Sequence, residues 1–304
     1  MFRIIEIADR SFSLSLSNNN LCAEKEDRAL TSVPLDEISA VLITEPSITL
    51  TGVLLSELGR RQIPLVCCNK NYLPAALLTG VTFAGKKNLP LLQYKLTKFA
   101  KAKIWQRLIR SKIAGQNLIL QKWRNNCALA RYPDLVVSGD KKGMEAQASA
   151  IYWRSLAVFD HRNHCANDAN ILFNYGYAIL YAAFAREIVL AGLLPDLGIW
   201  HHHRDNDYNL ASDLMEPLRP CIDNIILQIL SQTPVRENLS KSTKENFFKQ
   251  LYSMRLKYDS SWHTLFSFIR ITVRSFVSYL HTPELSCLVF PCWEEEDYVD
   301  FGNF

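Results

Sequence analysis

GVTFAGKKNLP, residues 80–90, is the stretch at which the hydrophobic pattern of the chain changes. Its two glycines and its proline are typical of a connecting segment. Before it, short β-branched or alternating runs are bounded by Asn, Pro and Gly, whereas after it apolar residues recur at helical spacing. We therefore predict an α+β fold with a small β-rich domain at residues 1–80, a linker at 81–90 and a larger all-α domain at 91–304.

The N-terminal side of this segment contains five runs with the pattern of short strands, and one of them, SFSLSLS, is followed directly by an Asn-rich turn. LTGVLLSELGRR, residues 50–61, has apolar residues at helical spacing instead and ends near Gly59 and two arginines. The predicted strands are residues 2–8, 11–17, 39–45, 63–68 and 75–80.

The C-terminal side carries long, mostly amphipathic helical patterns and few strand signals. Pro217 and Pro220 interrupt one of these patterns, and we expect a kink or a new helix start there because each proline removes an amide donor. The predicted helices are residues 89–117, 141–159, 168–193, 209–230 and 262–280.

Length and composition favour a folded protein that does not enter a membrane. The chain has 304 residues, of which 48% are apolar, enough for substantial cores. No run reaches the roughly 20 uninterrupted apolar residues of a membrane span. Glu6 and Asp9 interrupt the apolar N-terminus, which is unlike a secretory signal. We expect a cytoplasmic protein.

Positive charge is concentrated in one part of the chain, although the net charge is only +4. No acidic residue occurs between Glu57 and Asp134, and the predicted helix at 89–117 interleaves lysines and arginines with aromatic residues. Such a helix attracts backbone phosphates through counterion release. A solvated face, a membrane-surface helix or a calmodulin target would show the same stripe. The residues we select as DNA contacts are Lys98, Lys101 and Arg107.

HHHRDNDYNLASDLMEPLRP, residues 201–220, gathers histidines and acids into one short segment. Asp213 and Glu216 are three residues apart, so on a helix they lie on one face. Their mutual repulsion calls for a nearby cation, which is either Arg219, in an ordinary salt bridge, or a metal ion. Oxygen ligands with one imidazole suit Mg²⁺ or Mn²⁺.

Glu145 is the best third ligand, because it falls near the start of a predicted helix just after a turn rich in Gly and Lys. At most one histidine of the HHH triplet is expected to bind a metal, and the sequence alone does not select it. A weaker zinc candidate is formed by His161, His164 and Cys165.

Four segments together resemble the CRISPR-associated adaptation integrases, the DNA endonucleases that insert new spacers into CRISPR arrays. They are ITLTGVLLSELGRRQIPLVCCNKNYLPAALL at 48–78, SGDKKGMEAQASAIYW at 138–153, NILFNYGYAIL at 170–180 and AGLLPDLGIWHHHRDNDYNLASDLMEPLRPCID at 191–223. The similarity runs in family order from residue 1 to about 225. DLMEPLRP looks most like the type II subgroup, which accompanies a single large effector nuclease.

The resemblance implies a set of site residues and a cofactor. It implies that Glu145, His201 and Glu216 are catalytic and hold Mg²⁺ or Mn²⁺, which selects His201 from the triplet. Asp213 is then the nearby acid and Arg219 a clamp for phosphate or carboxylate. The positions of the NYGYAIL-like motif that are implied to line the site are Asn174 and Tyr177.

The same resemblance implies insertion of captured double-stranded DNA at a CRISPR repeat by attack of a 3′ hydroxyl. It also implies homodimers, two of which are bridged by a small dimeric adaptation protein, with residues 1–80 serving dimerisation and partner docking and residues 91–304 catalysis. Two other functions fit the residues. One is a standalone structure-specific nuclease in repair or transposition, and the other is a non-catalytic DNA-binding scaffold.

Overall fold

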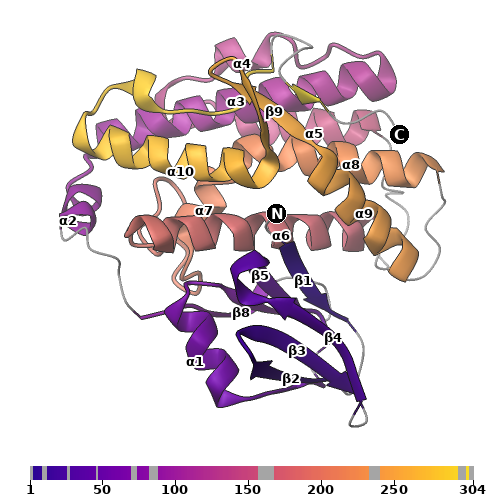
Figure 1. Cartoon of the computed structure of the whole chain (residues 1–304). Coiled ribbons are helices and arrows are strands. Elements are labelled where there is room, and N and C mark those ends of the chain that lie inside the picture. Colours follow the sequence, from indigo (N-terminus) through magenta and orange to yellow (C-terminus); the bar gives the residue numbers. More distant parts are fainter. Residues whose placement is uncertain are drawn as a thin grey trace.

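The computed structural model describes residues 3–8, 12–25, 28–45, 47–69, 74–81, 88–156, 168–232, 240–293 and 299–300. The N-terminal strands lie on one side of the molecule, and helix α6 (Asp168–Ala191) runs between them and α10 (Leu265–His281) (Figure 1). The α+β prediction, with a β-rich N-terminal part and a helical C-terminal part, is confirmed.

Two four-stranded sheets form the N-terminal part. In the first, with the order β1-β5-β7-β8, three parallel strands are followed by an antiparallel edge strand. In the second, β3 pairs antiparallel with β2 and β4, and β6 runs parallel to β2. The strands are β1 Arg3–Ile7, β2 Phe12–Ser17, β3 Asn20–Lys25, β4 Arg28–Pro34, β5 Ile38–Ile43, β6 Thr49–Leu50, β7 Leu65–Cys68 and β8 Pro74–Leu78.

The predicted Asn-rich turn joins β2 to β3. Asn18 and Asn19 both have positive φ, the backbone that a two-residue hairpin with right-handed strand twist requires. The sequence did not predict β3 and β4 as strands, because their charged and small residues give a weak alternating pattern. Helix α1 (Gly52–Arg60) is confirmed, and Thr51 caps it by accepting a hydrogen bond from Leu54.

The C-terminal part is built on a long helix, α3 (Lys98–Arg124). The predicted helix at 89–117 divides into α2 (Leu89–Tyr94) and α3 because the Thr97 side chain caps a new helix start by accepting from the Ala100 amide. The remaining helices and short 3₁₀ turns are α4 Tyr132–Leu135, α5 Met144–Leu156, α7 Asn209–Leu214, α8 Arg219–Gln232, α9 Lys241–Ser253, η1 Leu35–Glu37, η2 Ser138–Asp140, η3 Glu216–Leu218 and η4 Leu285–Cys287.

The proline prediction is also confirmed, since the pattern at 209–230 folds as α7, the 3₁₀ turn η3 and α8 rather than as one helix. Pro220, in the first turn of α8, packs against α3 at Gly115. A Cβ on Gly115 would lie 2.8 Å from Pro220 Cγ and 2.7 Å from the ring of Trp293. Gly115 is therefore a position of close approach between α3, α8 and the segment that follows α10.

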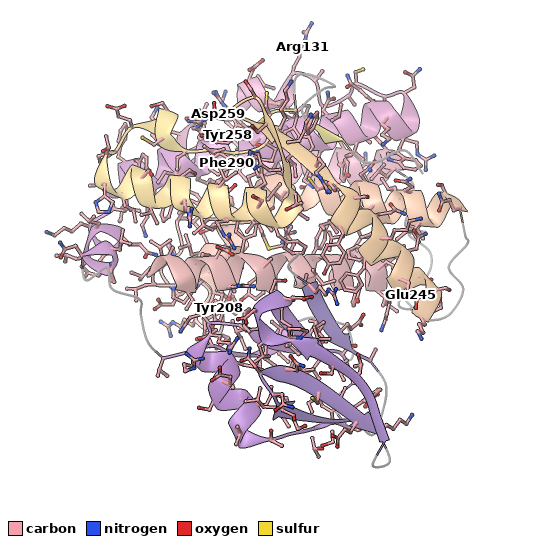
Figure 2. All side chains as sticks on the ribbon, viewed as in Figure 1. Arg131, Tyr208, Glu245, Tyr258, Asp259 and Phe290 are labelled. Atoms are coloured by element: carbon pink, nitrogen blue, oxygen red, sulfur yellow. The ribbon has the colours of Figure 1, made fainter. Side chains whose placement is uncertain are left out.

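The prediction that residues 91–304 are all-α is wrong. A three-stranded sheet forms from β9 (Arg255–Tyr258), β10 (Ser261–Thr264) and β11 (Val299–Asp300). Asp259 and Ser260 turn the β9–β10 hairpin with positive φ at both residues. Figure 2 labels Asp259 and its neighbour Tyr258. The short strands were hidden because the helical pattern of α10 follows at once, with its start fixed by the Thr264 cap.

Within the described ranges, no helix combines the length and apolarity needed to cross a membrane.

Candidate active site

An ammonium group on α3 lies between two carboxylates from other elements. Lys112 Nζ is 2.7 Å from Glu145 Oε1 and 2.6 Å from Glu216 Oε2. The Lys112 and Glu216 side chains are only 8% and 4% exposed, and that of Glu145 is 28% exposed. Two predicted site residues that are 71 positions apart in the sequence are therefore held together by a third residue that the sequence analysis did not select.

Glu145 owes its position to a capping interaction at the start of α5. The Asp140 carboxylate accepts hydrogen bonds from the Met144 amide at 2.8 Å and the Glu145 amide at 3.0 Å. These amides belong to the first turn of the helix, where backbone donors lack helical partners. The Gly- and Lys-containing turn before α5 thus fixes the direction in which Glu145 leaves the helix.

Glu216 begins the 3₁₀ turn between α7 and α8 and is almost completely buried. Arg219 Nε lies 3.2 Å from its Oε1, so the ordinary salt bridge considered from the sequence does form. Burial raises the pKa of Glu216, but the positive charges of Arg219 and Lys112 outweigh it and leave the pKa below its usual value. Glu216 is therefore ionised at neutral pH despite its burial.

Lys112 occupies a core-facing position of α3. Trp105 and Leu108, seven and four residues before it, are buried, as is Gln116 four residues after it. Burial lowers the pKa of Lys112, but the facing carboxylates of Glu216 and Glu145 more than compensate and raise it. The cluster is held as charged groups in an environment that screens them poorly.

His201 is oriented by Asp213. Its Nδ1 lies 2.6 Å from Asp213 Oδ1, and the same carboxylate accepts hydrogen bonds from the backbone amides of Ile199, Trp200 and His201. The hydrogen bond to Asp213 raises the pKa of the imidazole, and the charges of Glu216 and Glu145 raise it further. With Nδ1 engaged, Nε2 is the ring nitrogen left for a ligand.

The turn that carries His201 depends on Gly198. A Cβ there would lie 2.2 Å from the His201 carbonyl oxygen and 3.0 Å from Asp213 Oδ2. Lys101, on α3, donates a hydrogen bond to the Gly198 carbonyl at 3.0 Å. The Trp105 ring meets the His201 ring edge to face, with centroids 5.5 Å apart. The Gly198 turn, the Lys101 hydrogen bond and the Trp105 ring together limit the orientations that the His201 imidazole can adopt.

The described His, Cys, Asp and Glu side chains do not form any group of three at metal-ligand spacing. The donor set nevertheless has the chemistry that Mg²⁺ and Mn²⁺ prefer, with two carboxylates and one imidazole nitrogen. Glu216 Oε2 is buried against the Lys112 ammonium at 2.6 Å, so it would coordinate a cation in place of that ammonium. The residues therefore fit a hard divalent ion, provided that Lys112 moves aside.

Arg219 and Tyr177 lie beside the acid pair. The Arg219 guanidinium is 4.8 Å from the centroid of the Tyr177 ring, and the Tyr177 hydroxyl donates to Asp223 Oδ1. Both residues line an open cavity of about 370 Å³ that Asn206 and Tyr208 also border (Figure 2 labels Tyr208).

Asn174, the other residue expected to line the site, is half-buried on α6, three residues before Tyr177.

The three basic residues selected on α3 are placed differently from one another. Lys98 is exposed in the first turn of the helix. Lys101 holds the Gly198 carbonyl, and Arg107 is half-buried and donates to the Leu285 carbonyl. Of the three, Lys98 is thus the one whose charge faces solvent directly, while the other two also position loops.

Asp223, like Lys112, was not identified from the sequence. It is buried on α8 and accepts hydrogen bonds from the hydroxyls of Tyr152, at 2.9 Å, and Tyr177. Burial raises its pKa to about 6. Helical spacing offered a signal for both residues, because each is a charged side chain on an otherwise apolar stripe. The weaker zinc candidate, His161, His164 and Cys165, lies outside the described residues.

Comparison with known proteins gives consistent matches over most of the chain. The family described as CRISPR associated protein Cas1 matches residues 6–257. A CRISPR-associated endonuclease Cas1 from Neisseria meningitidis is 32% identical over 243 residues, covering 79% of this chain and 80% of the relative. A CRISPR-associated endonuclease Cas1 from Saccharolobus solfataricus is 27% identical over 238 residues, covering 75% of each.

Solved structures share the fold. A casposase bound to an integration product superposes with a TM-score of 0.82 at 16% identity, covering 100% of this chain and 96% of the casposase. A Cas1 protein from Thermotoga maritima has a TM-score of 0.77 at 18% identity, covering 96% of this chain and 100% of that protein. The similarity extends from the N-terminal sheets through the helical part.

Proposed function

Because this chain belongs to the Cas1 family of CRISPR-associated proteins, we propose that it is a DNA endonuclease and integrase of CRISPR adaptation. It inserts captured foreign DNA fragments into the CRISPR array by transesterification. The observation that carries the proposal is the acid pair Glu145 and Glu216, whose charges act on an imidazole whose Nδ1 is held by Asp213. This donor set suits phosphodiester chemistry.

We propose that Glu145, His201 and Glu216 hold Mg²⁺ or Mn²⁺. When bound, the ion supplies a Lewis acid for a phosphoryl oxygen and offsets the negative charge that develops in the transition state. The Asp213 carboxylate keeps the Nδ1 proton of His201 in place and so presents the Nε2 lone pair. Arg219, next to Glu216 and one third exposed, is placed to bind a nonbridging phosphate oxygen.

The reaction exchanges one phosphodiester for another. A 3′ hydroxyl oxygen of the captured fragment attacks the phosphorus at the repeat boundary, a new P–O bond forms, and the bond to the leaving 3′ oxygen breaks. The attacking hydroxyl loses its proton and the leaving oxygen gains one. With water as the nucleophile the same site would hydrolyse DNA, which is the chemistry of the standalone-nuclease alternative.

Insertion of a duplex requires two attacks on opposite strands, and hence two sites held apart. We propose a homodimer, with two dimers bridged by a small dimeric adaptation protein. Residues 1–80 serve dimerisation and docking, residues 81–90 act as the linker and residues 91–304 carry catalysis. Solved complexes of similar fold are titled Cas6-RT-Cas1--Cas2, which supports a protein partner. The Neisseria relative is a type II protein, and its identity of 32% exceeds the 27% of the Saccharolobus relative, which supports the type II subgroup.

The test is a strand-transfer assay on a supercoiled plasmid bearing a repeat, with the small partner and a divalent ion. Glu145→Gln and His201→Ala should each reduce joining by at least about a hundredfold and leave DNA affinity near normal. Glu245→Gln, at an exposed acid on α9, is the matched control. Joining retained by both site variants with Mn²⁺ present would rule out the metal site. The scaffold alternative predicts no joining even by the unmodified protein.

A further inference from the structure

The charges of the buried cluster balance without a divalent ion. Lys112 and Arg219 contribute two positive charges, and Glu145 and Glu216 contribute two negative charges. Adding a divalent cation to these four groups leaves an excess of two positive charges among them, where Glu216 and Lys112 are nearly inaccessible to water. The nearby carboxylates that could offset this excess, those of Asp213 and Asp223, already accept hydrogen bonds from other groups. Such an excess is strongly unfavourable in a poorly screened environment.

Lys112 also stands in the way of the ion. Its ammonium approaches one oxygen of each acid to within 2.7 Å, so an ion coordinated by both carboxylates would meet it directly. Arg219 cannot make room equally well, because its guanidinium is stacked on the Tyr177 ring. The ammonium of Lys112, on a flexible stem of four methylenes, is the group that can leave.

A DNA phosphate can supply the negative charge that the cluster needs in order to hold a divalent ion. A phosphate in the site brings negative charge that offsets the ion and gives the displaced ammonium a new partner. We propose that Lys112 competes with the catalytic metal for the acid pair, so that the ion and a DNA phosphate load together. This inference rests on the proposed metal site but goes beyond it, because it assigns the coupling between metal binding and DNA binding to one residue of the chain.

Coupling of this kind is reciprocal, since DNA must raise metal affinity by the same factor by which metal raises DNA affinity. Lys112→Met keeps the length and burial of the side chain and removes its charge. The variant should therefore bind metal without DNA and lose most of the coupling.

The experiment measures free Mn²⁺ by electron paramagnetic resonance in titrations of the full chain, alone and with a short DNA duplex. For the unmodified protein, DNA should tighten Mn²⁺ binding by about tenfold or more. Lys112→Met should bind Mn²⁺ at least about tenfold more tightly than the unmodified protein when DNA is left out, with less than about twofold further gain from DNA. Lys249→Met, at an exposed lysine on α9, should behave like the unmodified protein.

Two results would overturn the inference while leaving the metal site intact. One is Mn²⁺ binding by the unmodified protein that DNA does not change, and the other is unchanged coupling in Lys112→Met. If the variant fails to fold, as judged by circular dichroism and gel filtration, the linkage in the unmodified protein decides alone. Failure of the proposed function looks different, because neither protein would then bind Mn²⁺ with or without DNA, and Glu145→Gln would change nothing.

Discussion

Asp213 accepts hydrogen bonds from three consecutive amides and the adjoining imidazole, although its spacing from Glu216 suggested a second ligand on the same helical face. That spacing argument assumes a continuous helix, but α7 ends at Leu214 and Glu216 starts a 3₁₀ turn. The two carboxylates consequently have different surroundings. Asp213 is fully buried and committed to the turn of His201, while Glu216 faces Lys112 and Arg219.

Asp223 provides a residue-scale prediction for pH dependence. Its pKa is raised from 3.8 to about 6 by burial, so the folded protein holds this proton more tightly than the unfolded chain does. Its contribution to stability is therefore lost as pH rises from about 4 to about 6. Relative to the unmodified protein, Asp223→Asn should gain about 2 kcal/mol in free energy of unfolding between pH 4 and pH 7.

Urea unfolding at both pH values checks this, with Asp205→Asn, at a fully solvated acid, as the control. Parallel pH curves for Asp223→Asn and the unmodified protein would contradict the shift.

At the scale of single residues, the sequence predicted three acid and histidine side chains for the candidate site, but not the lysine that forms ion pairs with two of them. Glu145, His201 and Glu216 were selectable because motifs of a known family carry them. Lys112 was not selected, because the fifteen basic residues between Glu57 and Asp134 were treated as one charged stretch and its place on the apolar stripe of α3 was overlooked. Only the register of α3 against its buried face distinguishes it.

Helix α3 combines two roles along its length. Near its start, Lys98 and Phe99 are exposed, and Lys103 lies 5.6 Å from the centroid of the Phe99 ring. Further along, the helix is buried on the stripe that leads to Lys112. Exposed lysines beside an exposed aromatic ring suit a nucleic-acid backbone and an unstacked base.

The exposed section yields a prediction at the scale of this element. Changing Lys98 and Lys103 of α3, together with the exposed Lys95 at the end of α2, to Gln should weaken DNA binding and reduce the slope of log affinity against log salt by up to about 3. Fluorescence anisotropy at several salt concentrations measures both quantities. Lys101 and Arg107 are left unchanged because they also hold backbone carbonyls. Matched changes of Lys241 and Lys249 on α9 should have little effect, and an unchanged slope in the triple variant would show a merely solvated face.

Elements were predictable where a single periodicity ran for many residues. The pattern at 168–193 became α6 almost unchanged, whereas that at 89–117 was divided by one capping threonine. Boundaries of this kind depend on one side-chain hydrogen bond, which periodicity does not report. The β9–β10 hairpin was missed for a related reason, because four-residue strands are shorter than the window needed to recognise alternation.

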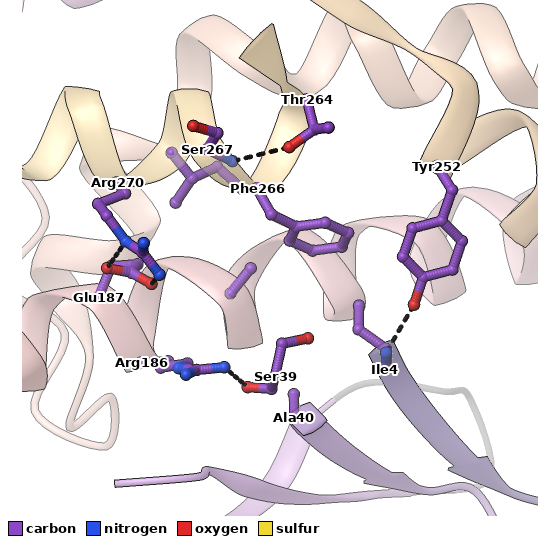
Figure 3. A pocket seen from close by; sticks show the side chains of 12 residues that line it. Ile4, Ser39, Ala40, Arg186, Glu187, Tyr252, Thr264, Phe266, Ser267 and Arg270 are labelled. Carbon is purple, nitrogen blue, oxygen red and sulfur yellow. Dashed lines mark hydrogen bonds and ion pairs between the residues drawn. The ribbon is translucent and has the colours of Figure 1, made fainter. Parts of the chain in front are cut away.

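Across the whole molecule, the N-terminal sheet β1-β5-β7-β8 is fastened to the helical part by polar contacts. Tyr252 accepts a hydrogen bond from the Ile4 amide at 2.6 Å, and Lys244 Nζ lies 3.0 Å from Glu6 Oε1. Arg186 donates to the Ser39 carbonyl nearby (Figure 3). The residues of the Ile4–Tyr252 and Arg186–Ser39 contacts line a mainly apolar cavity of about 280 Å³ that is separate from the candidate site.

The ion pair between Glu6 and Lys244 tests how strongly this connection contributes. Both side chains are about nine tenths buried, and the Tyr175 hydroxyl also donates to Glu6. Glu6→Gln should destabilise the protein by about 3 kcal/mol, because the carboxylate facing a buried ammonium is removed. Adding Lys244→Met should recover much of this loss.

Urea unfolding of the two single variants and the double variant gives the coupling energy. Additive effects would show that the pair contributes nothing to the connection. The sequence did not predict this pairing, because residues 238 positions apart carry no local pattern that links them.

The close approach at Gly115 has a consequence for biosynthesis. A nascent chain that has emerged as far as residue 232 already contains every proposed ligand, together with Lys112 and Arg219. It still lacks Trp293, whose indole packs on α3 at Gly115. The ribosome must therefore add some sixty further residues before α3, which carries Lys112, is covered on that side. The core around the candidate site is thus completed only after all of the site residues have been translated.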